Sequence, residues 1–501
     1  MRSAGPNIAA NFVARAAVGL MTLAFTPAYL AMLGIQAYGV VGTFVALQTI
    51  LYIFDFGMGL TLNRQLARLA TGGPESAQDI RDAIRTFEAV YWTVGIVLGL
   101  ALVVAAPFFG SAWFQSSDLS PAQVSRALAL MGIALAAQWP SLLYIGGLFG
   151  LQRQLSANVI LTIAAFIRGA GAIALMTFVS PTLEVFFMWQ VVASGFQTVA
   201  LRIRLRQVTL GGTSSGQFRA AIIRSNMKFA ADLTGITILG TLLIQLDKVV
   251  LSRGVALSDF GYYVLAGTIA SSVNLFVSPV FNAVFPRLTA ATAVGEIEAT
   301  RRTYHEASQV MSVMIWPLSL VLIAFAPEVL YVWIGVAPSE TTVWLVRILV
   351  AGTALNGLMN IPYGLMLASG WSRLPLLLNL VAVLVLVPFI VYMTSRFGTV
   401  GGAFAWLLLN VGYVSLGIAA MHRRLLRGEG GAWYAFDVGL PLLGGLLAVM
   451  ACRVLITGGT RGEMIVVLAT AGAVAVCGSA LASGFVRSIA SGWIGAKRVA
   501  R

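Results

Sequence analysis

The sequence predicts an all-α polytopic membrane protein with about fourteen transmembrane helices. Of its 501 residues, 59% are hydrophobic and 10% are charged, whereas charged residues make up about 25% of a typical soluble domain. The hydrophobic residues form runs that reach the roughly 20 residues needed to cross a bilayer. Most charged residues lie between these runs, as expected for the loops of a membrane protein.

Hydrophobic runs of sufficient length follow one another along the chain. In order, they cover residues 8–33, 38–63, 86–110, 122–150, 157–180, 182–204, 222–251, 258–286, 306–335, 341–368, 374–395, 399–421, 434–456 and 463–487. Many contain glycine or proline, which membrane helices tolerate. The pairs Gly95 and Gly99, and Gly146 and Gly150, each place small residues one turn apart, which favours close packing between helices.

The basic residues predict the orientation of the chain. With a cytoplasmic N-terminus, few basic residues fall in outer loops, namely Arg253, Arg396, Arg453 and Arg461. The inner segments then hold many more: Arg64, Arg68, Arg81, Arg85, Arg202, Arg204, Arg206, Arg219, Arg224, Arg287, Arg301, Arg302, Arg423, Arg424, Arg427, Arg487, Lys497, Arg498 and Arg501. Because cytoplasmic loops carry an excess of lysine and arginine, both termini are predicted to be cytoplasmic.

Two segments of the chain resemble each other. Residues 33–68 and 257–290 each begin with an aromatic residue followed by glycine, cross one hydrophobic run and end at an arginine. Internal repeats of this kind are typical of transporters. We therefore predict two pseudo-symmetric six-helix lobes, at 1–205 and 222–425. A cytoplasmic linker at 206–221 joins them, and 426–501 adds two transmembrane helices and a basic cytoplasmic tail.

Several function classes are disfavoured by the sequence. The net charge of +14 does not indicate nucleic-acid binding, because the basic residues punctuate hydrophobic runs instead of forming one basic face. The longest outer loop, 111–121, has Asp118 as its only charge, and no nucleotide-binding or catalytic motif is present. His305 and His422 are too isolated in the sequence for a metal site. We expect no enzyme activity, no cofactor and no metal.

Specific motifs connect the chain to a known family. These are Leu33-Gly34 with Tyr38-Gly39 after the first run, Asp55-Phe56-Gly57 in the second, and LDKVVLSRGVALSDFGYYVLAG (246–267) followed by FPRLT (285–289). With these motifs, residues 1 to 425 resemble Wzx-type polysaccharide flippases of the multidrug/oligosaccharidyl-lipid/polysaccharide (MOP) superfamily. The resemblance implies transport of an undecaprenyl-pyrophosphate-linked oligosaccharide to the outer leaflet by alternating access. It also implies a bacterial plasma membrane, which is the inner membrane in a Gram-negative host.

Basic residues inside the hydrophobic runs are candidates for binding the pyrophosphate. A charge at mid-membrane costs roughly 2.5–3.5 kcal/mol, so it normally faces protein or water. Arg168 has roughly ten apolar residues on either side, which makes it hard for its guanidinium to reach an interface. Arg15 is expected to meet the substrate from the inner side. Arg347, Lys228 and Lys248 either line a cavity or reach an interface or an acid.

Other polar residues in the runs are candidates for sugar binding, ion coupling or gating. Asn11 is expected to contact sugar hydroxyls, although amide side chains also form hydrogen bonds between helices. Asp55 either braces the Gly57–Gly59 turn or binds an ion. Asp232 lies one turn after Lys228 and is expected to pair with it. Asp247 and Lys248 point about 100° apart on a helix, so we expect no direct pairing and assign Asp247 to an outer gate.

The predicted function is the flipping of this lipid-linked repeat unit for cell-surface polysaccharide synthesis, driven by a sodium or proton gradient. The expected partners are the lipid-linked oligosaccharide, membrane lipids, and the polysaccharide polymerase with its chain-length machinery. Three alternatives stay open at this point: an ion-coupled multidrug exporter of the same superfamily, a lipid II flippase, and a non-transporting scaffold of a glycan assembly complex.

Overall fold

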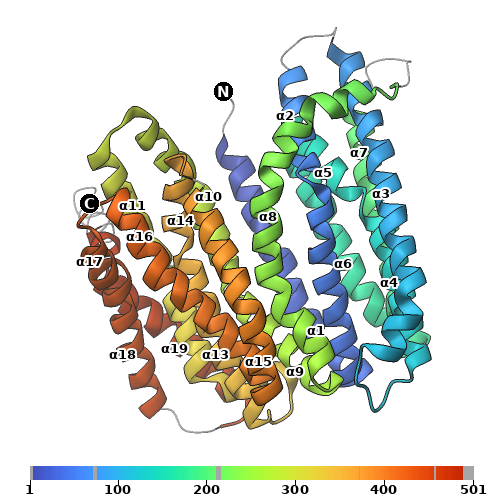
Figure 1. Ribbon diagram of the computed structural model, residues 1–501. Coiled ribbons are helices and arrows are strands. Elements are labelled where there is room, and N and C mark those ends of the chain that lie inside the picture. Colours follow the sequence, from blue (N-terminus) through green and yellow to red (C-terminus); the bar gives the residue numbers. More distant parts are fainter. Residues whose placement is uncertain (1–3, 71–75, 210–215, 372, 456–458, 489–501) are drawn as a thin grey trace, which may run out of the picture. The chain divides into compact units, whose positions relative to one another are not determined.

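The computed structural model describes residues 4–70, 76–209, 216–371, 373–455 and 459–488, and these are helical over almost their whole length (Figure 1). For residues 4–11, 225–237 and 455 only the backbone is described. The chain groups into two compact units, Met1–Gly261 and Tyr262–Arg501. The predicted lobe boundaries at 205 and 222 remain a prediction.

The described residues of the first unit form eight α-helices and the beginning of a ninth. In order, these are α1 (Ala4–Leu51), the 3₁₀ turn η1 (Tyr52–Asp55), α2 (Met58–Leu69), α3 (Ser76–Ala112), α4 (Pro121–Gln138), α5 (Ser141–Gly150), α6 (Gln154–Phe178), α7 (Leu183–Thr209), α8 (Ala220–Gly254) and α9 (Leu257–Ser271). Gly34 interrupts α1 with a φ of 80°, a left-handed value that glycine adopts without strain. The first two predicted spans therefore meet at this residue.

The second unit begins within α9 and continues through α10 (Asn274–Val294), α11 (Ile297–Ala324), α12 (Ala326–Ile334), α13 (Glu340–Leu358), α14 (Asn360–Ala368), α15 (Arg373–Gly412), η2 (Tyr413–Gly417), α16 (Ile418–Arg424), α17 (Gly430–Ala432), η3 (Trp433–Gly439), α18 (Leu440–Leu455) and α19 (Arg461–Ala482). Gly398, with a φ of 57°, interrupts α15 between the eleventh and twelfth predicted spans. The segments η2 and η3 are π-helical.

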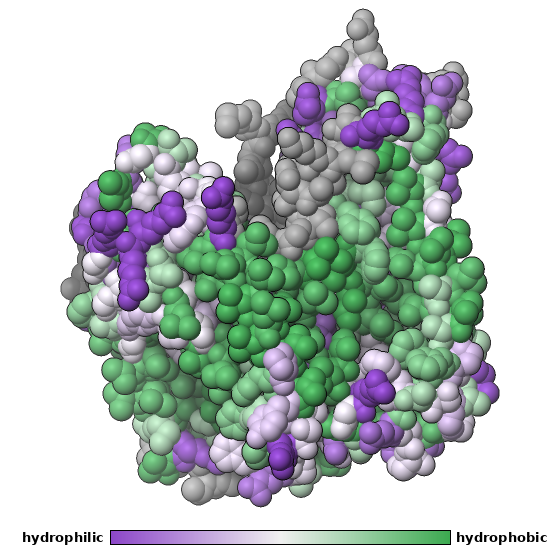
Figure 2. Space-filling view, in the orientation of Figure 1, coloured by the Kyte–Doolittle hydropathy of each residue, from purple (hydrophilic) through white to green (hydrophobic). Residues whose placement is uncertain are grey.

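The predicted fold class is confirmed. Within the described residues, 10 helical segments are long and apolar enough to cross a membrane. Two of these, Phe12–Asp55 and Arg373–Arg424, each cover most or all of two predicted spans. The more polar helices α7 and α8 correspond to the sixth and seventh spans. In the view of Figure 2, hydrophobic side chains cover a broad part of each unit's surface and hydrophilic ones gather at its ends.

Glycine residues allow the helices of the first unit to pack closely. A Cβ atom added to Gly146 would lie 2.5 Å from the carbonyl oxygen of Gly59, and one added to Gly150 would lie 2.5 Å from that of Asn63. Helices α5 and α2 therefore approach backbone to backbone. This confirms the close packing predicted for the glycine pair on α5.

Candidate functional site

Arg168 lies on α6 and reaches towards α7. Its Nη2 donates a hydrogen bond of 3.0 Å to Oε1 of Gln197, which is buried. Its Nε is also buried and makes no hydrogen bond to any of the described residues. Because buried N–H groups in folded proteins are nearly always paired, this donor still needs an acceptor beyond the described residues.

Aromatic side chains hold the backbone around Arg168 in place. The Tyr29 hydroxyl on α1 donates to the carbonyl of Gly169 at 3.3 Å, and Trp189 Nε1 on α7 donates to the carbonyl of Ile167 at 3.0 Å. Among the described residues, no carboxylate forms an ion pair with Arg168. The arrangement therefore presents a positive charge that is fixed in position and not neutralised by these residues.

Arg347, unlike Arg168, contacts the end of a neighbouring helix. It lies on α13, and its Nε donates to the carbonyl of Ile323 at 3.2 Å, in the last turn of α11. Its guanidinium lies 5.1 Å from the centroid of the Trp344 ring. A cation next to the last carbonyls of a helix stabilises that helix end. Arg347 thus contacts a helix end and an aromatic ring, which the sequence did not indicate.

The expectation for Asp247 and Lys248 is wrong. Lys248 Nζ lies 3.4 Å from Oδ1 of Asp247, and it also donates to the carbonyl of Ile244 at 3.2 Å. The lysine stem is long and flexible, so its ammonium group folds back along α8 and reaches the adjacent carboxylate despite the angle between the two Cβ directions. Lys248 is therefore satisfied locally.

Of the other predicted residues, some have described side chains and some do not. Arg15 is described and is exposed on α1. The side chains of Asn11, Lys228 and Asp232 lie outside the described residues, so their predicted roles stay predictions.

Asp55 makes the contacts expected of a residue that braces a turn. Its Oδ2 accepts a hydrogen bond of 3.3 Å from the backbone N–H of Gly59, and its Oδ1 accepts one from the Tyr91 hydroxyl. Phe56 and Gly57 have φ values of 47° and 69°, and a left-handed phenylalanine is strained. The carboxylate therefore stabilises the break between η1 and α2, in agreement with the bracing interpretation.

A buried acid on α3 was missed by the sequence analysis. Glu88 is 3% exposed and accepts a hydrogen bond of 2.6 Å from Nε of Arg202 on α7. The Tyr144 hydroxyl donates to it at 2.7 Å, and Arg85 and Arg206 each lie 3.6 Å from it. The only sequence signal is that Arg202 and Arg206 lie one turn apart on one helix face.

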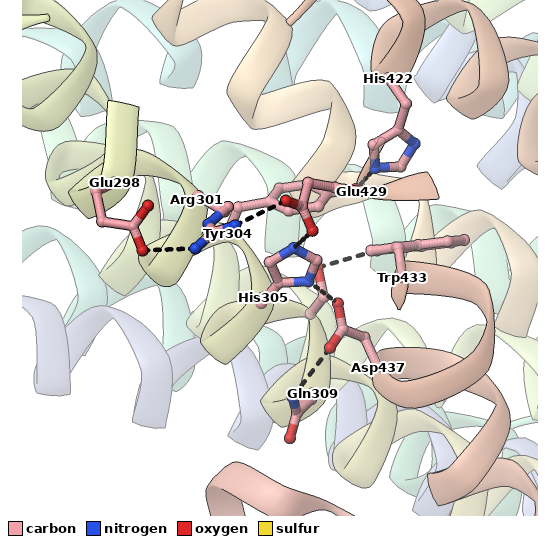
Figure 3. Close-up of polar contacts among 10 residues, drawn as sticks. Glu298, Arg301, Tyr304, His305, Gln309, His422, Glu429, Trp433 and Asp437 are labelled. Atoms are coloured by element: carbon pink, nitrogen blue, oxygen red, sulfur yellow. Dashed lines mark hydrogen bonds and ion pairs between the residues drawn. The ribbon is translucent and has the colours of Figure 1, made fainter. Parts of the chain in front are cut away.

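A second polar group joins α11 to the start of the thirteenth span (Figure 3). We call it the His305 cluster; it consists of Glu298, Arg301, His305, Gln309, Glu429 and Asp437. His305 contacts Asp437 through Nδ1 and Glu429 through Nε2, the latter at 3.2 Å. Because both ring nitrogens face carboxylates, only the imidazolium form donates at both positions.

The rest of the His305 cluster extends to both sides of the imidazole. Arg301 donates to Glu429 at 3.0 Å and to Glu298 at 2.7 Å, and its hydrogen bond holds the pKa of Glu429 below the usual value of a glutamate. On the other side, Gln309 donates to Asp437 at 2.9 Å. The Gln309 carbonyl oxygen accepts from the Ser483 hydroxyl and from the N–H of Phe485, each at 2.9 Å. This cluster therefore ties the last two spans to α11.

The His305 cluster does not form a metal centre. No group of three or more histidine, cysteine, aspartate or glutamate side chains within the described ranges is arranged to hold a metal ion. His305 looks isolated in the sequence because its carboxylate partners lie 124 and 132 residues away. The other histidine of the chain, His422, donates from Nδ1 to the carbonyl of Ile418 and contacts the Tyr304 hydroxyl through Nε2.

Comparison with known proteins identifies the family. The model of the family described as "Polysaccharide biosynthesis protein" matches residues 4–292, more than half of the chain. The chain belongs to this polysaccharide biosynthesis family. A putative O-antigen transporter of Shigella flexneri is 20% identical over 379 residues, which cover 75% of the chain and 87% of that relative.

Solved structures confirm the fold expected of this family member. The lipid II flippase MurJ, in an inward closed conformation, matches with a TM-score of 0.69 at 14% identity and covers 96% of the chain and 98% of MurJ. An inward-facing multidrug resistance transporter of the MATE family in the MOP superfamily matches with a TM-score of 0.65 at 12% identity, covering 81% and 96%. The chain is therefore a multi-pass membrane protein with the fold of these transporters.

Proposed function

We propose that the protein moves an undecaprenyl-pyrophosphate-linked oligosaccharide from the cytoplasmic to the outer leaflet of a bacterial plasma membrane. The observation that supports this substrate most directly is Arg168, a guanidinium on a membrane helix with a buried N–H that makes no hydrogen bond to the described residues. The family and the similarity to a putative O-antigen transporter support a role in the export of a polysaccharide precursor.

The chemistry of the substrate matches that of Arg168. A pyrophosphate that leaves water needs donors for its oxygen atoms, and a guanidinium offers five N–H groups in a planar fork that suits phosphate. The hydrogen bond to Gln197 occupies Nη2 and fixes the side chain, which leaves donors on the other nitrogens. In this proposal Arg15 meets the substrate first from the cytoplasmic side, and a sodium or proton gradient drives alternating access.

A cation at this position disfavours the multidrug alternative. Exporters of cationic drugs benefit from acids that attract the positive charge of the drug, whereas Arg168 repels it. Asp55, one of the acids that the sequence offers for such a role, is engaged by Tyr91 and Gly59. A lipid II flippase carries the same kind of pyrophosphate lipid, so Arg168 serves that alternative equally well.

The proposal is tested by replacing Arg168 in a strain that lacks the native gene. Loss of a charged partner costs roughly 2–5 kcal/mol, so we expect Arg168→Gln to reduce surface polysaccharide at least about tenfold. Completed lipid-linked repeat units should accumulate in the cytoplasmic leaflet. Arg347→Gln is the matched control, because this arginine is also on a membrane helix but contacts a helix end. It should support transport once protein levels are equalised.

Three results would count against the proposal. Full activity of Arg168→Gln would remove the pyrophosphate contact. Normal lipid-linked intermediates in the deletion strain, together with new sensitivity to cationic dyes, would show drug export instead. Accumulation of lipid II with arrested cell-wall synthesis would identify the lipid II alternative.

A further inference from the structure

Two adjoining cavities lie on the second unit, where α16 and η2 face the beginning of the thirteenth span. The first has a volume of about 510 Å³ and is lined by Arg423, Arg427, His422, Tyr434 and the glycines of the 428–431 turn. The second, of about 330 Å³, is lined by Leu355, Val411, Val414 and Ser415. Ala419 and Tyr434 line both cavities, so the two form one continuous groove.

The first end of this groove is basic. Arg427 uses its Nε to donate to the carbonyl of Arg423 at 3.1 Å, which leaves its two terminal nitrogens for other acceptors. Within the described part of the chain, neither arginine forms an ion pair. The adjacent acid, Glu429, is engaged by Arg301 at 3.0 Å and by His305 at 3.2 Å. Glu429 is therefore paired within the His305 cluster and forms no ion pair with Arg423 or Arg427.

The second end of the groove is apolar. Leucine and valine side chains dominate its lining, and the Ser415 hydroxyl is turned inward to the carbonyl of Val411 at 2.7 Å. The Tyr434 hydroxyl donates to the carbonyl of Val414, which lies in the π-helical turn η2, at 2.5 Å. The polar groups at this end are thus paired, which suits a hydrocarbon chain and not a polar ligand.

The length of the groove matches one leaflet of a bilayer. Arg423 and Val411 lie twelve positions apart, so they are separated by at most roughly 18 Å, the value for an α-helical rise of about 1.5 Å per residue throughout. Half of a hydrocarbon core of about 30 Å is about 15 Å. A chain that begins at the arginines would therefore reach approximately the depth of the bilayer centre.

We infer that this groove binds an anionic phospholipid of the membrane, with its phosphate at Arg423 and Arg427 and one acyl chain along Ala419 to Val411. Basic pockets between membrane helices on the cytoplasmic side bind anionic headgroups, and positive-inside orientation assigns these arginines to that side. The site is separate from Arg168, which lies in the first unit. A bound lipid would join α16 to η3 and so hold the thirteenth span in place.

The test compares lipid retention by the purified full-length protein. The protein is reconstituted into vesicles of phosphatidylcholine and phosphatidylglycerol at three to one, extracted gently, and its retained lipids are counted by native mass spectrometry. We expect the wild type to retain phosphatidylglycerol preferentially and Arg423→Gln/Arg427→Gln to reduce that retention at least fivefold. The charge-matched control is Arg424→Gln/Arg487→Gln, because Arg424 stacks 4.5 Å above the Trp371 ring and neither arginine lines the groove.

A second variant separates a bound lipid from diffuse charge attraction. Ala419→Phe fills the wall shared by both cavities without changing any charge, and it should also lower phosphatidylglycerol retention at least fivefold. Equal retention by the two double variants, or no effect of Ala419→Phe, would overturn the proposal. Displacement of the lipid by millimolar glycerol phosphate would show that a free phosphate ester, not a lipid, is the ligand.

Discussion

Glu88 on α3 and Arg202 on α7 form an ion pair of 2.6 Å between residues that are 114 positions apart in the chain. Glu88 is buried, and three arginines and one tyrosine surround its carboxylate. An acid in this setting is stable only while its partners remain, because a buried carboxylate without them is costly. The pair therefore holds α3 against α7 near one end of both helices.

Replacing the acid of this pair should lower the stability of the protein. Glu88→Gln removes the charge that three arginines share, and hydrogen bonds to charged groups contribute about 1.5–3 kcal/mol. The control is Glu184→Gln, which breaks the exposed pair between Glu184 and Arg126 and should cost less than about 1 kcal/mol. Thermal unfolding in detergent measures both. Equal melting temperatures for the two variants would contradict the assignment.

The close approach of α5 and α2 should make Gly146 intolerant of even one methyl group. In Gly146→Ala the new Cβ would meet the Gly59 carbonyl oxygen at 2.5 Å, and because this neighbour is backbone the helices must separate. We expect a loss of about 1–3 kcal/mol in stability.

Gly195 supplies the comparison for this change. An added Cβ there has nothing within 4 Å, so Gly195→Ala should leave the melting temperature unchanged or raise it slightly. If both glycine variants unfolded at the same temperature, the backbone contact between α5 and α2 would not exist in the native protein.

Glu429 should make the attachment of the last two spans sensitive to acid. Hydrogen bonding from Arg301 lowers the pKa of Glu429, so its ionised form stabilises the folded state at neutral pH. This stabilisation is present above the unfolded-state pKa and is lost as the pH falls through the lowered folded-state value. The difference in melting temperature between the wild type and Glu429→Gln should therefore be largest near pH 7 and shrink below about pH 4. A difference that grew in acid would show that the charge is unfavourable.

The fold was largely predictable because a membrane span is a local property of the sequence. Each apolar run needs only its own composition to cross the bilayer, and the structure places helices over each of the fourteen predicted runs. The breaks at Gly34 and Gly398 were also placed correctly between spans, since glycine tolerates a positive φ. The sequence indicated a turn at Gly57–Gly59 but not the left-handed Phe56 before it, because the contact between Asp55 and Tyr91 joins residues that are 36 positions apart.

The polar contacts were less predictable because they join distant residues. The apolar flanks of Arg168 predict a position inside the membrane, but they do not predict its partner Gln197, which lies 29 positions away on another helix. His305 was judged isolated for the same reason, although two carboxylates reach it. The expectation that Asp247 and Lys248 do not pair was wrong for a different reason. It considered only the directions of the two Cβ atoms and not the length of the lysine side chain.

The distance in sequence between His305 and Asp437 also has a consequence for biosynthesis. The two residues are 132 positions apart, so at about 5–20 residues per second the ribosome needs about 7–26 s to make the second after the first. During this interval α11 lacks the carboxylate of η3 that contacts its imidazole. A nascent chain stalled before Asp437 should therefore expose a polar α11 surface to the insertion machinery, and completion of the thirteenth span would bury it.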